Sequence, residues 1–130
     1  MSGDELIAQF ESGATPPQSF HHADHVRLAF EYLSQYPALE AMGRFSDALK
    51  SFATAQGKTQ LYHETITWAY LLLIRERIAR TGRAQTWDEF AERNPDLLVW
   101  EDGVLSTLYR QETLDSDFAR RIFVLPDRCL

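Results

Sequence analysis

The sequence predicts an all-α protein, a compact helical bundle of about four main helices followed by short C-terminal helices. Three observations favour this fold class. Apolar residues recur three and four positions apart in successive segments, which is the period of an amphipathic helix. Glycine and proline separate these segments. No run of alternating apolar and polar residues is long enough to indicate a strand.

The first half of the chain predicts three helices. The first is expected over residues 2–13, and the prolines of residues 14–18 then form an extended connector. The second begins within residues 19–24 and stops before Pro37, which starts a third helix that ends at Gly57. The expected core positions of these helices are Leu6, Ile7, Phe10, Val26, Ala29, Phe30, Leu33, Leu39, Met42, Phe45, Leu49 and Phe52.

The second half predicts one long helix and several short ones. The long helix is expected over residues 62–80, and because it is the most apolar we place it at the centre of the fold. Its apolar stripe is Ile66, Tyr70, Leu73, Ile74 and Ile78. Residues 86–89 form a capping box for a short helix, and residues 94–95 start another turn. Residues 104–109 indicate one more helix, and residues 115–122 a final capped turn.

Length and composition indicate one domain over residues 1–130. Of its residues 45% are hydrophobic and 25% charged, so a single core can carry the fold. The net charge of −6 argues against general binding to nucleic acid or to an anionic membrane, which needs a basic face. The most apolar run, residues 68–74, is too short to span a bilayer. With Cys129 as the one cysteine and no signal-peptide pattern, we expect a cytoplasmic protein.

The four histidines are concentrated where two of the expected helices begin. His21, His22 and His25 lie at the start of the second helix, and His63 lies at the start of the long fourth helix. On a helix, His22 and His25 extend the apolar stripe of the second helix, and His63 extends that of the fourth. If these two helices pack together, three imidazoles converge at one end of the core.

Converging imidazoles indicate a transition-metal site, because imidazole is the commonest protein ligand for zinc, iron, copper and nickel. We predict His22, His25 and His63 as the metal ligands, with a fourth position open to water as in catalytic zinc sites. Asp24 and Glu64 each adjoin a histidine and are the candidate catalytic carboxylates. They would orient a ring, complete the ligand set or act as a base. This interpretation makes the protein a candidate metal-dependent enzyme acting on a small molecule.

The sequence leaves two other functions open, so whether the protein is an enzyme stays undecided at this stage. One is a non-enzymatic helical module that binds a partner or a small molecule, with histidines that are structural and hydrogen-bonded to the backbone. The other is a metal-free acid–base enzyme that pairs His63 or His25 with Glu64 or Asp24. An apolar pocket beside the histidines would favour the acid–base enzyme over the module.

Several segments together resemble a family of small uncharacterised bacterial proteins. They are F-x-H-x-D-H-V-R-L-A from Phe20, Y-H-E-T-I-T from Tyr62, N-P-x-L-L from Asn94, A-R from Ala119 and F-V-x-P-D from Phe123. The resemblance covers most of the chain after Phe20 and carries over no activity. It implies that the two histidine segments belong to one functional unit, with His22, His25 and His63 as the candidate site residues.

Overall fold

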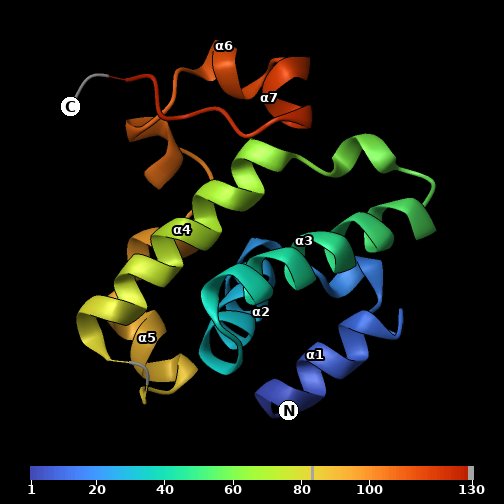
Figure 1. Cartoon of the computed structure of the whole chain (residues 1–130), viewed down its shortest axis with the longest axis vertical. Helices are drawn as coiled ribbons and strands as arrows, with labels where there is room; N and C mark the ends of the chain where they lie inside the picture. Colours follow the sequence, from blue (N-terminus) through green and yellow to red (C-terminus); the bar gives the residue numbers. More distant parts are fainter. Residues whose placement is uncertain (83, 129–130) are drawn as a thin grey trace.

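The computed structural model describes residues 1–82 and 84–128, so Cys129 lies outside the described residues. Across these residues the chain is helical and has no strand, which confirms the all-α prediction. The longer helices are α1 (Gly3–Glu11), α2 (His22–Gln35), α3 (Ala38–Ala55) and α4 (Glu64–Thr81). The shorter ones are α5 (Trp87–Arg93), α6 (Gln111–Leu114) and α7 (Asp117–Arg121) (Figure 1). Single 3-10 turns are η1 (Pro17–Ser19), η2 (Thr59–Leu61), η3 (Pro95–Leu98) and η4 (Val104–Thr107).

Local capping signals set several helix ends. The Ser2 hydroxyl accepts from the Glu5 N–H, and the Glu5 carboxylate accepts from the Ser2 N–H, each over 3.2 Å. Thr86 and Glu89 form the same capping box at the start of α5, as the sequence predicted. Gly82 follows α4 with a φ of 107°, a conformation that glycine adopts without a steric penalty.

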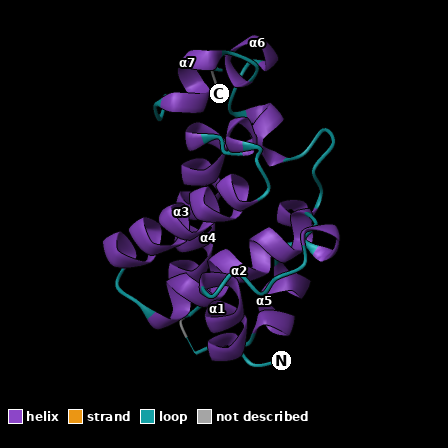
Figure 2. Cartoon of the chain, turned by 90° about the vertical axis from the view of Figure 1, so that its right-hand side faces the viewer, coloured by secondary structure: helices purple, strands orange, loops and turns teal. Residues whose placement is uncertain are grey.

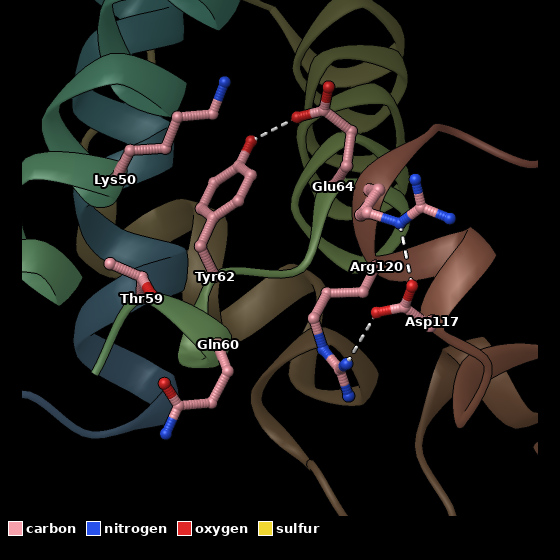
Figure 3. Close-up of a pocket in the computed structure, with 8 residues that line it drawn as sticks. Lys50, Thr59, Gln60, Tyr62, Glu64, Asp117 and Arg120 are labelled. Carbon is pink, nitrogen blue, oxygen red and sulfur yellow. Dashed lines mark hydrogen bonds and ion pairs between the residues drawn. The ribbon is translucent and has the colours of Figure 1, made fainter.

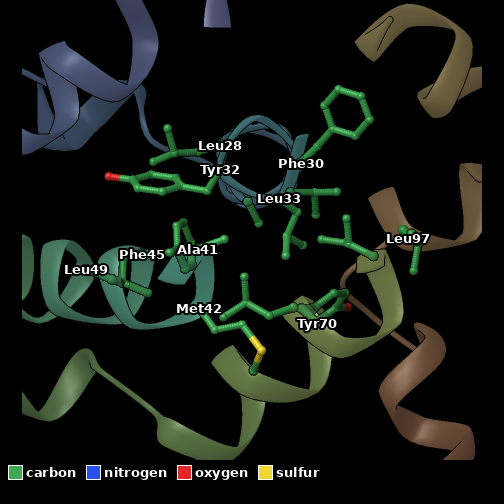
Figure 4. Packing of buried hydrophobic residues seen from close by; sticks show 14 of the residues in the cluster. Leu28, Phe30, Tyr32, Leu33, Ala41, Met42, Phe45, Leu49, Tyr70 and Leu97 are labelled. Atoms are coloured by element: carbon green, nitrogen blue, oxygen red, sulfur yellow. The ribbon is translucent and has the colours of Figure 1, made fainter. Parts of the chain in front are cut away.

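The core is built around α2, which packs against α1, α3 and α4. Figure 2 shows α2 between these helices, and Figure 4 shows the apolar side chains that α2, α3 and α4 direct toward one another. Tyr32 of α2 and both Leu71 and Ile74 of α4 are completely buried. α2 packs on α4, and residues at the starts of both helices line one cavity, described below.

Three details of the sequence prediction are wrong. Leu39 is 87% exposed, because α3 starts at Ala38 and directs Ala41 and Met42 inward instead. Leu73 is only half-buried, whereas Leu71 is completely buried. The reason is that α4 contacts α2, α3 and α7, so its buried residues are not confined to a single stripe. Finally, the helix expected over residues 104–109 is shorter, because only Val104–Thr107 are helical, as the 3-10 turn η4.

The C-terminal part of the chain is tied to the first half of α4, where Figure 1 shows α6 and α7 lying. The buried hydroxyl of Thr65 donates to the carbonyl of Ile122 over 2.8 Å and accepts from the N–H of Val124 over 3.0 Å. The Tyr109 hydroxyl donates to the Val124 carbonyl over 2.6 Å. These bonds fix the extended segment after α7 and thereby place α7 beside the start of α4.

Candidate functional site

A cavity of about 640 Å³, the histidine cavity, lies between α2, α3 and α4 near the start of α2 and of α4. Most of its wall is apolar: Pro17, Phe20, Val26, Ala29, Phe45, Leu49, Phe52, Ala53, Leu61, Ile66, Leu71, Ile74 and Trp100. The remaining lining residues carry polar groups: His22, His25, Gln56, Gln60, Tyr62, His63, Thr67, Tyr70 and Arg120. The structure therefore brings the three predicted histidines to one cavity, whereas His21 is exposed and does not line it.

His22 is held by a backbone carbonyl and by aromatic neighbours. Its Nε2 donates to the carbonyl oxygen of Leu97 over 2.9 Å, since a carbonyl can only accept. Its ring centroid lies 5.0 Å from that of Tyr70 and 5.2 Å from that of Trp100. Burial lowers the pKa of His22, so the ring is neutral at pH 7 and Nδ1 keeps its lone pair. One nitrogen of His22 is thus available to a ligand.

His25 offers more hydrogen-bonding capacity than the other two histidines. Its ring stacks on Phe20 with the centroids 3.9 Å apart, and no hydrogen bond joins it to another residue in the described ranges. Burial, with a further contribution from nearby His22, lowers the pKa of His25 to about 4. The neutral ring therefore presents one donor and one acceptor that a bound molecule can use.

His63 has both ring nitrogens in use. It is the N-cap of α4, where Nδ1 accepts from the N–H of Ile66 over 3.1 Å. Nε2 donates to the carbonyl of Leu114 over 2.8 Å. Burial lowers the pKa of His63, which keeps the ring neutral as both bonds require. To bind a metal ion, His63 would have to give up one of these two partners.

The two candidate carboxylates do not line the histidine cavity. Asp24 is exposed and accepts from the backbone N–H of His21 over 2.9 Å at the start of α2. Glu64 accepts from the Tyr62 hydroxyl over 2.5 Å (Figure 3). It lines a second pocket of about 390 Å³, the outer pocket, together with Lys50, Thr59, Gln60, Tyr62, Asp117, Arg120 and Arg121. Both candidate carboxylates thus lie outside the wall of the histidine cavity.

Among the described residues, the three histidines do not form a three-ligand metal group. In the described part of the chain, no group of three or more histidine, cysteine, aspartate or glutamate side chains is positioned to hold a metal ion. His22 and His25, one turn apart on α2, are the two that retain lone pairs. A histidine that donates one ring N–H to a carbonyl while the other nitrogen stays open is common among metal-binding histidines.

Sequence reasoning did not identify Arg120, which reaches the cavity from α7. The available signal was its place in one of the segments that carry the family resemblance. These segments touch one another: His22 binds the carbonyl of Leu97, and Thr65 binds the backbone at Ile122 and Val124.

Comparison with known proteins adds no relative, because no protein-family model, no curated protein and no solved structure matches the chain. Among the described residues, no helix has the length and apolar character that a bilayer crossing requires. The functional conclusion therefore depends on the histidine cavity itself.

Proposed function

We propose that this protein binds a small molecule with an apolar body in the histidine cavity. The observation that carries the proposal is a large cavity with apolar walls into which His25 presents an unpaired, neutral ring. Its volume of about 640 Å³ falls in the range of about 300–1,000 Å³ found for small-molecule sites. Protein interiors are otherwise close-packed, with few voids larger than a water molecule, so a space of this size supports a ligand-binding role.

Apolar side chains and histidines in the lining would contribute to binding in different ways. Burial of the ligand's apolar surface against the aromatic and aliphatic walls would supply most of the affinity. His25, and Nδ1 of His22, would give the ligand its orientation through hydrogen bonds. Because both rings are neutral at pH 7, they suit an uncharged hydroxyl, carbonyl or amide group on the ligand.

An acid–base enzyme has less support, although a pocket does lie beside the histidines. Asp24 and Glu64 both lie outside the cavity wall, so the expected histidine–carboxylate pairs are not formed there. A ring whose pKa is about 4, as in His25, is also a weak general base at neutral pH. We therefore favour binding without chemistry over acid–base catalysis, and we retain a cytoplasmic location as part of the proposal.

A transition-metal site on α2 is a second proposal. One observation favours it: His22 donates Nε2–H to the Leu97 carbonyl and leaves Nδ1 open, one helical turn from the unpaired ring of His25. Zinc, iron, copper or nickel would suit such imidazole ligands. His63 would join them only after leaving Ile66 or Leu114.

Binding in the cavity is tested by filling it. Wild-type protein should enhance the fluorescence of the neutral apolar probe N-phenyl-1-naphthylamine in a saturable way. Ala53→Phe places a large ring in the cavity wall and should abolish this signal, because Ala53 is buried and lines the cavity. Ala55→Phe is the matched control, since Ala55 is exposed on the same helix and lines neither the histidine cavity nor the outer pocket. Equal probe binding by both variants, with circular dichroism showing both folded, would contradict the proposal.

Metal binding is tested by elemental analysis of protein prepared without a histidine tag. The geometry predicts that His22→Ala and His25→Ala lose most of the metal, while His21→Ala, an exposed position, keeps it. Loss in His63→Ala as well would restore the three-histidine set predicted from the sequence. Wild-type protein that takes up none of zinc, iron, copper and nickel would exclude a metal from the site.

A further inference from the structure

The histidine cavity and the outer pocket share a boundary. Gln60, Tyr62 and Arg120 line both of them, so these three side chains lie where the apolar cavity meets the charged outer pocket. Figure 3 shows this region, with the Tyr62 hydroxyl directed at Glu64 and two arginines reaching toward Asp117. A ligand that fills the cavity and extends past this boundary would meet a different chemistry at each end.

Arg120 is the charged residue at this boundary, and its guanidinium has N–H donors available to a ligand. No other lysine, arginine, aspartate or glutamate of the described residues lines the histidine cavity. Its contact with Asp117 is long, at 3.4 Å, whereas Arg121 holds the same carboxylate at 2.8 Å. A guanidinium carries five N–H donors, so most of those on Arg120 are open to a ligand.

The charged side chains that line the outer pocket sum to one positive charge. The outer pocket contains Lys50, Arg120 and Arg121 against Glu64 and Asp117, a balance of three positive and two negative side chains. Glu64 is already engaged by the Tyr62 hydroxyl. This excess of one positive charge stands out in a chain whose net charge is −6. A ligand group with a single negative charge would neutralise it.

From these observations we infer that the molecule bound in the histidine cavity is a monocarboxylic acid with an apolar body. Its carboxylate lies at the boundary and accepts hydrogen bonds from Arg120, while its apolar body occupies the cavity between α2, α3 and α4. The planar fork of an arginine matches the two oxygens of a carboxylate, which makes such pairs strong and directional. This inference rests on the proposed function and names the chemical class of its ligand.

Calorimetric titration with decanoate and with the uncharged decanamide tests the inference. Wild-type protein should bind decanoate at least about tenfold more tightly than decanamide, as charge-assisted hydrogen bonds to an arginine predict. Arg120→Gln should lower the affinity for decanoate much more than that for decanamide and so remove this preference, and Arg120→Lys should restore part of it. Arg75→Gln is the matched control, because Arg75 is exposed on α4 and lines neither pocket.

The outcomes separate the two proposals. Equal affinity of the wild type for decanamide and decanoate would overturn the carboxylate inference and leave the cavity as a binding site. A decanoate preference that survives in Arg120→Gln would likewise overturn the role of Arg120. Tighter binding of decyl phosphate than of decanoate would refute the inference that the ligand carries a single negative charge. Failure of both decanoate and decanamide to bind, together with failure of the neutral fluorescent probe, would overturn the proposed function itself.

Discussion

Replacing Thr65 with valine tests the attachment of the C-terminal segment to α4. Thr65 is completely buried, and its hydroxyl serves two backbone groups, the carbonyl of Ile122 and the N–H of Val124. Valine has nearly the same shape, so Thr65→Val leaves no new cavity but leaves both backbone groups without their partner. A buried polar group left unpaired costs about 1–3 kcal/mol. Because Ile122 is exposed and Val124 half-buried, water compensates in part, and we expect a loss of about 2–3 kcal/mol in total.

Urea unfolding at pH 7, followed by circular dichroism, measures this loss. Thr65→Ser is the matched control, because it keeps the hydroxyl and removes one methyl group, worth about 0.8 kcal/mol. Thr65→Val should therefore be clearly less stable than Thr65→Ser. Trypsin should also cleave Thr65→Val faster after Arg121, which is exposed at the end of α7. A valine variant as stable as the serine variant would refute the role given to these two hydrogen bonds.

Two further predictions concern the core and the response to pH. Ile74→Ala should lower the free energy of unfolding by about 2–5 kcal/mol, because Ile74 is completely buried, and Leu73→Ala should cost less because Leu73 is half-buried. If urea unfolding gives the same loss of stability for both variants, the difference in burial between Ile74 and Leu73 is wrong. The pKa of His25 is lowered from 6.5 to about 4 in the folded state, so below pH 6.5 the unfolded chain takes up a proton that the folded protein does not. The free energy of unfolding should therefore be constant above pH 6.5. As the pH drops toward 4, protonation of His25 in the unfolded chain should lower it by up to about 3 kcal/mol. His25→Phe keeps an aromatic ring against Phe20 and should flatten this decline, and an unchanged pH profile would contradict the assignment.

The sequence predicted the main helices because their ends and their apolar faces depend on local signals. Caps such as Ser2 and Thr86 act within a single turn, and the apolar spacing of α2 carried His22 and His25 to the inward face. The role of His63 was harder to predict, because the helix was expected to start two residues too early. That small shift turns a candidate ligand into the N-cap of α4.

Other features of the site depend on contacts between distant parts of the chain. Arg120 reaches the cavity only because α7 is packed beside the start of α4. The carbonyls of Leu97 and Leu114 accept from His22 and His63 across 75 and 51 residues. Main-chain carbonyls have the same chemistry at every position, so a sequence cannot mark which of them a histidine will use.

The attachment of residues 122–124 to Thr65 also bears on hydrogen exchange. Opening of this segment alone would break its hydrogen bonds to Thr65 and Tyr109 but none of those within α2, α3 and α4. The free energy of such a local opening is smaller than that of global unfolding. The amide of Val124 should therefore exchange with solvent deuterium sooner than the amides in the middle of α4. If a ligand at Arg120 bridges α7 and the cavity, saturating decanoate should slow exchange at Val124 selectively, which would report occupancy from a position that does not itself line the cavity.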